Sequence, residues 1–320
     1  MLDYNSSLTL LGERSSEKKM FKAYEKVVDR ILKLLDEGTV PWKKTWAGFG
    51  SPRNLISTNK YKGINALLLG CAGYSSPYWM TYKQANKVEG HVKKGASGWP
   101  IIYYEIKALS LYNFCKWTKT DPSSYTKHDW AKIVEQGKNK KPLARLYYVF
   151  NIEDIEMDDS WIPKFEKTPD FNPIVKAENI LRRYTDAPPI YEIEGGGRAF
   201  YNPRKDIIKM PNKEQFNSEA EFYSTLFHEC VHSTGHKDKL DRNLDDMTGY
   251  AKEELVAEIG ACILSNEAGI MAEVEKNSAS YIESWRKKIV ADKQIIIKAA
   301  RDAAKAADWI NKPAEGDEWV

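Results

Sequence analysis

Hydrophobic residues follow two different spacings in the first 120 residues. In residues 17–37, apolar side chains including Val27 and Ile31 recur every three or four positions, which predicts a helix. Residues 38–120 carry short β-prone runs such as GWPIIYYEIKALSLYNF, separated by Gly and Pro, and one short helical stretch at TYKQANKVEG. This mixture predicts an α+β fold for the first part of the chain.

Composition breaks divide the chain into two domains. The polar segment 120–141 ends in a lysine cluster and is predicted to be an insertion or mobile loop, after which ARLYYVFNI has the pattern of a strand. The acidic, proline-bearing stretch that follows predicts a linker at 152–173. We therefore expect a mixed α/β domain at 17–151 and a second domain at 174–312, because 320 residues can bury more than one core.

The second domain begins with the helical pattern VKAENILRRYTDA. A hairpin is predicted next, with RAFYN and IIKMP as strands and PRKD as the turn. Ser218 and Glu221 have the Ser-x-x-Glu spacing of a capping box, which predicts that a long helix begins there. Further helices are expected to about residue 310.

The run His-Glu-Cys-Val-His lies on this long helix. His228 and His232 are one turn apart on one face, so two imidazole nitrogens can converge on one tetrahedral zinc ion. Glu229 lies beside that face and is the candidate general base that takes a proton from the attacking water. Tyr201 and Tyr250 are the candidates for stabilising a developing oxyanion. The pattern predicts a zincin-like metallopeptidase domain with one Zn²⁺, and a purely structural zinc is the alternative.

The third metal ligand has several candidates. Glu254 and Glu258 lie on one face of the next predicted helix, 22 and 26 residues after His232. We favour Glu254 as ligand and Glu258 as the carboxylate that accepts a hydrogen bond from a ligand imidazole. Glu258 itself, Asp238 and His236 remain alternative ligands.

Composition excludes several classes of protein. No run of 18 or more apolar residues is present, and the N-terminus lacks the pattern of a secretory signal. The four cysteines are widely spaced without a C-x-x-C pair, which argues against a disulfide framework. We therefore expect a cytoplasmic protein without membrane contacts.

Charge differs strongly between the two halves. Residues 1–150 hold 25 basic and 12 acidic residues, whereas the remainder holds 23 and 33. Residues 41–120 hold 12 basic and 2 acidic residues and five of the ten tryptophans. Cations interleaved with aromatic rings are typical of a groove that binds single-stranded nucleic acid without sequence preference.

A single-stranded nucleic acid is therefore the expected partner of the first domain. Its candidate contacts combine aromatic, cationic and amide side chains from four short segments: Trp42, Lys43, Lys44, Trp46, Arg53, Asn54, Lys60, Tyr61, Lys62, Asn65, Trp79, Tyr82, Lys83, Lys93 and Lys94. Trp99, Tyr103 and Tyr104, in their strand, are expected to pack in the core instead. Binding is expected to weaken with salt.

Two long segments resemble a known family. The run AFYNPRKDIIKMPNKEQFNSEAEFYSTLFHECVHSTGHKDKLDRNL, followed by AKEELVAEIGACIL, resembles the metallopeptidase domain of ArdC-type antirestriction proteins. PWKKTW, PRNLISTNKYKGINALLL, YWMTYKQANKVEGHVKKGASGWPIIYY and YYVFNIEDI resemble that family's single-stranded-DNA-binding domain. The family's pattern does not require an acid at position 238, which disfavours Asp238 as ligand.

The resemblance implies a function. Such proteins travel on conjugative plasmids, resemble the N-termini of TraC-type primases and protect incoming DNA from host restriction endonucleases. The resemblance therefore implies a protein that coats entering single strands and whose zincin domain engages a host restriction-related protein or peptide. The alternatives are a replication accessory with a structural zinc and a regulatory protease whose basic half binds acidic proteins.

Overall fold

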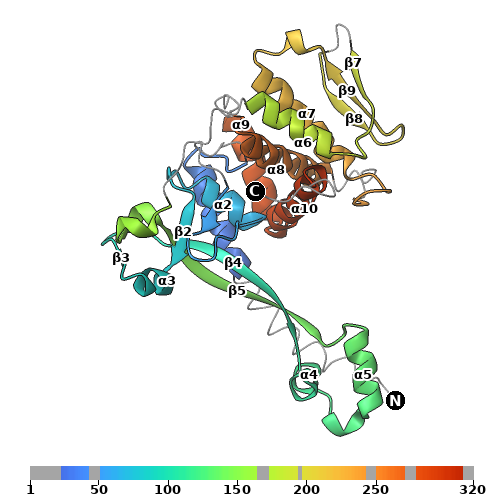
Figure 1. Ribbon diagram of the computed structural model, residues 1–320. Helices are drawn as coiled ribbons and strands as arrows, with labels where there is room; N and C mark the ends of the chain where they lie inside the picture. Colours follow the sequence, from blue (N-terminus) through green and yellow to red (C-terminus); the bar gives the residue numbers. More distant parts are fainter. Residues whose placement is uncertain are drawn as a thin grey trace. The chain divides into compact units, whose positions relative to one another are not determined.

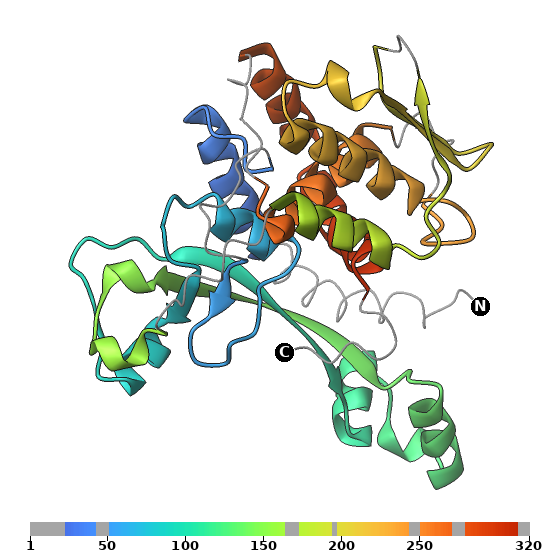
Figure 2. The ribbon, with the colours of Figure 1, turned by 45° about the horizontal axis from the view of Figure 1, so that its top comes forward.

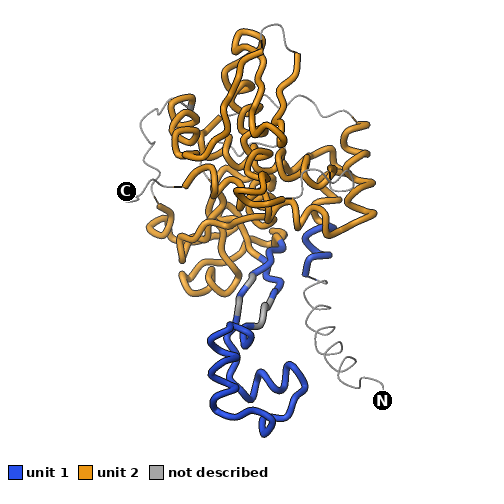
Figure 3. The backbone as a smooth tube through the Cα atoms, turned by 90° about the vertical axis from the view of Figure 1, so that its right-hand side faces the viewer, with its two compact units in different colours: residues 1–29, 100–148 blue, residues 30–99, 149–320 orange. Residues whose placement is uncertain are grey.

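The computed structural model describes residues 23–42, 51–163, 173–193, 197–242, 250–270 and 279–312. The chain forms two compact units, one of residues 1–29 with 100–148 and the other of residues 30–99 with 149–320 (Figure 3). Helices and strands are mixed in the way the sequence predicts for an α+β protein (Figure 1). In the part of the chain that is described, no helix is long and apolar enough to cross a membrane.

The first helix and a four-stranded sheet organise the N-terminal half. Residues 23–36 are helical, and Val27, Ile31 and Leu35 are buried, which confirms the predicted helix over the described residues. The sheet has the strand order β1-β2-β5-β4. Its members are β1 (Arg53–Asn54), β2 (Tyr78–Thr81), β5 (Lys140–Asn151) and β4 (Trp99–Ala108). β1 runs parallel to β2, and β2 antiparallel to β5.

Short elements complete this half. The helix α2 (Ile64–Gly70) precedes β2, and α3 (Tyr82–Lys87) confirms the predicted helical stretch, with a capping box between Thr81 and Gln84. β3 (His91–Val92) pairs with β6 (Ile155–Glu156), flanked by the 3-10 turns η2 (Ile152–Asp154) and η3 (Asp159–Trp161). Ile152 and Ile155 are buried with Met80, so the first part of the expected linker packs into this core.

The segment 100–148 differs from its prediction. The strand β4 ends at Ala108, and SLYNF belongs to the helix α4 (Leu111–Thr118). The polar stretch expected to be a mobile loop contains η1 (Pro122–Ser124) and the helix α5 (Lys127–Glu135). Local capping explains the error, because Asp121 and the Thr126–Asp129 pair satisfy helix-start N–H groups despite the low hydrophobicity of these turns.

The C-terminal half stacks helices on a small sheet. Its elements are α6 (Pro173–Arg183), β7 (Ile190–Ile193), β8 (Phe200–Asn202), β9 (Ile207–Pro211), η4 (Lys213–Gln215), α7 (Glu219–Ser233), α8 (Tyr250–Ala268), α9 (Ala279–Ala291) and α10 (Gln294–Ile310). The sheet order is β7-β9-β8, and β8 and β9 form the predicted antiparallel hairpin. The helix α7 contacts β8 and β9 on one side and α8 on the other (Figures 1 and 2).

The helix α8 lies at the centre of the helical layer. It contacts α6, α7 and α10, and buried residues such as Leu255, Ile259 and Leu264 surround its axis. Gly260 lies against Val231 of α7, where an added Cβ would come within 2.7 Å of a Val231 methyl carbon. Only a glycine lets the two helices approach this closely. The close approach brings the acidic turn of α8 beside the histidines of α7.

Candidate metal centre

The histidine helix begins where the sequence predicts. Ser218 Oγ accepts a hydrogen bond from the Glu221 backbone N–H at 3.2 Å. The Glu221 carboxylate accepts from the N–H of Asn217 at 2.9 Å, so the second bond of the expected capping box goes to the residue before the cap. The helix ends at Ser233, with Thr234 as its last capping residue before Gly235.

Three side chains from two helices converge at one point. The Nε2 atoms of His228 and His232 lie 3.1 Å apart. Glu254 of α8 places one oxygen 3.8 Å from His228 Nε2 and the other 3.7 Å from His232 Nε2. Donor atoms of these three residues all lie within 4.8 Å of one another. The structure thus brings together both predicted histidines and the favoured carboxylate.

The donor set fits a divalent ion. Ligands of a tetrahedral zinc at about 2.0 to 2.1 Å are separated by roughly 3.3 Å, and the three observed separations scatter around that value. Burial and the neighbouring His232 lower the pKa of His228 to about 3, so this imidazole is neutral, as a metal ligand must be. Two imidazoles and one carboxylate leave a fourth position open for substrate or water.

Glu253, which the sequence analysis missed, lies on the other side of His232. Its Oε1 is 3.2 Å from His232 Nδ1, so this nitrogen carries the proton and Nε2 is left to bind a metal. Arg242 holds the same carboxylate with two hydrogen bonds, of 3.0 Å from Nε and 2.8 Å from Nη2. Arg242 also donates to Thr234 Oγ1 and to the carbonyl of Val231. No spacing rule points to Arg242, because it lies in the loop between the helices.

The other carboxylates predicted to take part in the metal site, Glu258 and Asp238, lie outside the converging group. Glu258 accepts a hydrogen bond from the Tyr281 hydroxyl, and the carboxylate beside a ligand imidazole is Glu253 instead. The reason is geometric, because His232 lies between the adjacent side chains of Glu253 and Glu254. Asp238 has an exposed side chain beside His236, and neither belongs to the converging group.

Glu229 is buried next to the converging group. Burial raises the pKa of its carboxyl group, while the charge of His232 and a hydrogen bond from the backbone N–H of Tyr201 act in the opposite direction. Arg198 is a second cation near this carboxylate. The Tyr201 hydroxyl donates to Asp206 at 2.8 Å, so the residue supplies its backbone and not its phenol to Glu229.

Tyr250 begins α8 and is exposed. Interaction with the Glu254 carboxylate, by charge and by hydrogen bond, raises the pKa of the Tyr250 hydroxyl. Tyr201 and Tyr250 were the two candidates for stabilising an oxyanion. Of these, Tyr250 places its hydroxyl beside the metal-binding group, through its interaction with Glu254.

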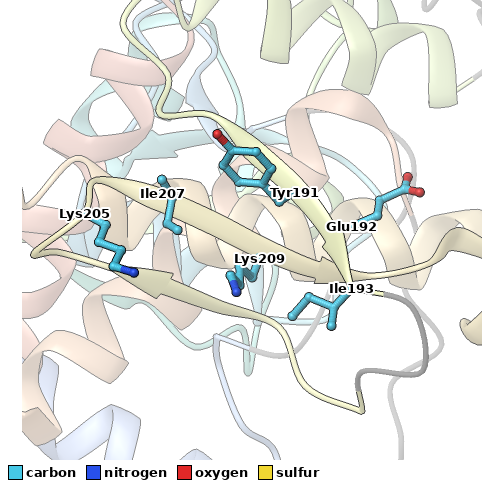
Figure 4. Close-up of a pocket in the computed structure, with 6 residues that line it drawn as sticks. All are labelled: Tyr191, Glu192, Ile193, Lys205, Ile207 and Lys209. Atoms are coloured by element: carbon cyan, nitrogen blue, oxygen red, sulfur yellow. The ribbon is translucent and has the colours of Figure 1, made fainter.

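The outer face of the small sheet forms a shallow hollow. Figure 4 shows Tyr191, Ile193, Lys205, Ile207 and Lys209 around it. Ile208 and Met210, which alternate with these residues along β9, are buried. Because neighbouring strand residues point to opposite faces, the hollow lies on the side of the sheet away from the buried Ile208 and Met210 and is separate from the metal-binding group.

The predicted DNA contacts have four outcomes: some lie outside the described residues, some are buried, some are bonded to neighbouring groups and some are exposed. Lys43, Lys44 and Trp46 lie outside the described residues. Trp42 and Trp79 are 1% exposed and offer no ring face to a base, so their prediction is wrong for the structure described. Trp42 packs edge-on against Trp285 of α9 and donates to the Tyr281 hydroxyl, which makes it part of the core between the two halves of the sequence.

Other predicted contacts are held by neighbouring groups. Asn54 is buried and bonds Gln84 and Tyr61. Lys62 pairs with Asp308 at 2.8 Å, and Lys93 donates to the Glu153 carbonyl. Arg53 lies over the Tyr78 ring, and Asn65 is half-buried. Exposed side chains remain at Lys60, Tyr82, Lys83 and Lys94.

Two family models match the chain. A model described as the N-terminal domain of anti-restriction factor ArdC matches residues 21–150. A zincin-like metallopeptidase model, MPTase-PolyVal, matches residues 179–302 and so contains the converging histidines.

Relatives extend the similarity over most of the chain. The DNA primase TraC of Escherichia coli is 37% identical over 301 residues, which are 90% of this chain but 27% of TraC, so the chain spans about a quarter of that primase. The uncharacterized protein y4eC of Sinorhizobium fredii is 29% identical over 90% of this chain and 91% of its own.

The chain is also similar to two solved structures of one relative, over nearly the whole length of that relative. The metal-free crystal structure of the antirestriction protein ArdC from plasmid R388 is 32% identical, with a TM-score of 0.66 over 90% of this chain and 96% of ArdC. Its Mn(II)-bound structure is 31% identical with a TM-score of 0.65. The chain therefore belongs to the ArdC family of antirestriction proteins, with an ArdC-type N-terminal domain and a zincin-like domain.

Proposed function

We propose that this protein is an antirestriction protein that binds single-stranded DNA and carries a zinc metallopeptidase-like domain. The observation that carries the proposal is the convergence of His228, His232 and Glu254 beside Glu229, in a chain similar to R388 ArdC over 96% of that protein's length. We place its action in the bacterial cytoplasm, on DNA that enters by conjugation. Residues 17–151 and 174–312 are the proposed DNA-binding and zincin-like domains.

The zincin-like domain supplies a base and positioned ligands. The relative that binds Mn(II) supports a divalent ion here, and two imidazoles with a carboxylate suit zinc. When bound, the ion acts as a Lewis acid toward a peptide carbonyl. Glu229 takes the proton of the attacking water and passes it to the leaving nitrogen. Glu253 holds the His232 ring in place throughout.

Substrate binding uses the edge of the small sheet. Among the described residues β8 pairs only with β9, so we propose that an extended peptide adds to its other edge. β8 also contacts the histidine helix, and Tyr201 of β8 bonds Glu229 through its backbone. A host restriction-related protein or peptide is the proposed occupant.

One pair of variants separates the two parts of the proposal. Glu229→Ala removes the base but keeps the proposed metal ligands, and Lys83→Glu with Lys94→Glu reverses two exposed charges of the DNA-binding domain. Protection of a transferred plasmid is measured in a restricting and a non-restricting host. Lys287→Glu, an exposed lysine on α9, is the matched control for charge reversal.

Loss of protection only in the lysine variant makes DNA binding the protective step, and loss only in Glu229→Ala makes peptide cleavage the protective step. Full protection by both variants would overturn the proposal. Reduced primer synthesis without any change in restriction would support a replication accessory with a structural zinc. The similarity to TraC does not favour that alternative, because the ArdC model matches the same part of the chain.

A further inference from the structure

Exposed tyrosines gather on the two-stranded ribbon of β4 and β5, in the unit that contains residues 100–148. Figure 1 shows these two strands side by side. Tyr103 of β4 is 50% exposed, and Tyr147 and Tyr148 of β5 are 39% and 47% exposed. The rings of Tyr103 and Tyr147 contact each other edge-on, with centroids 6.0 Å apart, so the two side chains share one face of the ribbon. Tyr103 was expected in the core, but it is half exposed, and among the described residues no layer covers this face of the ribbon.

Cations accompany this tyrosine pair. Lys107 lies four residues after Tyr103, and Arg145 lies two residues before Tyr147, so both fall on the same face by strand alternation. The side chains of Lys107 and Arg145 are both exposed. Glu105, which lies between Tyr103 and Lys107 in β4, is the acidic residue on this face. Residues 100–148 hold nine basic and four acidic residues. Two of these acids, Asp121 and Asp129, are used in capping turns at the end of the ribbon.

The helices at the end of the ribbon have their own aromatic core. Phe114 of α4 is buried and contacts the rings of Trp117, Tyr125 and Trp130. The same unit therefore buries one aromatic cluster and leaves another exposed among cations. Adjoining exposed rings such as Tyr103 and Tyr147, set among cations, are a candidate binding surface.

We propose that the ribbon face formed by Tyr103, Lys107, Arg145 and Tyr147 binds single-stranded DNA. This inference rests on the proposed function and names a surface for it that the sequence analysis did not contain. Tyrosine rings stack on unpaired bases, while the lysine and arginine contact phosphates. In a duplex the base faces are already covered by stacking, so the tyrosine rings can stack on bases only in a single strand.

The test uses the full chain and a fluorescein-labelled oligothymidylate, with affinity measured by fluorescence anisotropy. Tyr103→Ala with Tyr147→Ala should weaken binding by about tenfold or more, because each stacked base is worth about 1 to 3 kcal/mol. Tyr103→Phe with Tyr147→Phe should keep the affinity, since the rings remain. Tyr191→Ala is the matched control, because this tyrosine is 52% exposed on the other unit. Circular dichroism checks the fold of each variant.

Photocrosslinking locates the contact directly. An oligonucleotide with 5-iododeoxyuridine should crosslink to a peptide that contains Tyr103 or Tyr147. Unchanged affinity in the alanine variant, together with loss in Lys83→Glu with Lys94→Glu, would overturn the ribbon site and leave the proposed function intact. Failure of the wild type to bind the oligonucleotide would overturn DNA binding itself. Equal loss of affinity for a hairpin duplex would overturn the preference for single strands.

Discussion

The metal-binding group and the basic surface are built in opposite ways. His228, His232 and Glu254 lie on two helices that pack closely at Gly260, and the hydrogen bond that His232 donates to Glu253 orients its ring. The exposed cations of the N-terminal half include Lys83, on the short helix α3, and Lys94, in the turn that follows β3. Metal ligation requires donor positions within tenths of an ångström, whereas phosphate contacts tolerate mobile side chains.

The comparison also concerns aromatic residues. Cations and tryptophans are neighbours in the sequence around residue 42, yet Trp42 packs in the core and the exposed tyrosines lie on the ribbon. Aromatic residues have two uses, as core and as stacking platform, and composition alone does not separate them. Histidines one turn apart next to a glutamate have few uses other than binding a metal. The sequence is therefore more informative for the metal centre than for the DNA surface.

Removal of a metal ligand should have the largest effect. Glu254→Ala should lower the metal content from about one ion per chain to near zero, since two histidines alone bind zinc weakly. The content is measured by plasma mass spectrometry after gel filtration with a chelator. Asp238→Ala, whose carboxylate is exposed outside the group, should keep its ion. The opposite pattern would show that the third ligand has been misassigned.

Truncation of a buried tryptophan should have the second-largest effect, on the free energy of unfolding. Trp42→Ala should lower the free energy of unfolding by about 3 to 5 kcal/mol, because it leaves a cavity and removes the contacts with Trp285 and Tyr281. Tyr82→Ala, at a 56% exposed side chain, should change it by less than about 0.5 kcal/mol. Urea unfolding followed by circular dichroism measures both. A small effect of Trp42→Ala would return this residue to the candidate DNA surface.

Loss of the Arg242 contacts should weaken the metal site without destroying it. Arg242→Ala frees the Glu253 carboxylate that orients His232, and such outer contacts change metal affinity by about 10- to 100-fold. Competition with a chromophoric chelator measures the affinity for zinc. Arg242→Lys should restore part of it, and Lys237→Ala, at an exposed lysine nearby, should have no effect. Unchanged zinc affinity in Arg242→Ala would show that the hydrogen bonds from Arg242 are not required for Glu253 to orient His232.

The ion pair of Asp302 with Lys252 gives the smallest effect and a dependence on pH. Burial tends to raise the pKa of Asp302, but hydrogen bonds from Lys252 and Arg301 outweigh it and hold the pKa below its ordinary value. A carboxyl group whose folded pKa is depressed stabilises the protein above its unfolded pKa of about 3.9, and this stability is lost as the pH falls through the folded value.

Asp302→Asn should therefore cost about 1 to 2 kcal/mol at pH 7, and this difference should shrink below about pH 4. Asp308→Asn breaks the exposed pair with Lys62 and should cost less than about 1 kcal/mol. Thermal unfolding at several pH values measures both variants. If the loss of stability in Asp302→Asn persists at low pH, the loss comes from altered packing and not from the charge of Asp302.

Local periodicity accounts for what could be predicted. Helix geometry places residues four apart on one face, so His228 and His232 converge wherever the helix lies. The capped start at Ser218 and the hairpin before it follow from contacts between residues close in sequence. The helix α5 was missed because it lies in a polar segment, although the Thr126–Asp129 pair caps its start and Trp130 packs against Phe114.

The sequence by itself determined the histidine pair, the neighbouring base and the acidic helix that faces them. The tertiary structure decided that Glu253 lies beside His232, that Arg242 supports it and that Trp42 is buried. These outcomes depend on which elements pack together, because Arg242 and Glu253 meet only when α8 packs on α7, and Trp42 meets Trp285 from 243 residues away in the chain. The exposure of Tyr103 has the same cause, since no third strand or helix covers this face of the ribbon among the described residues.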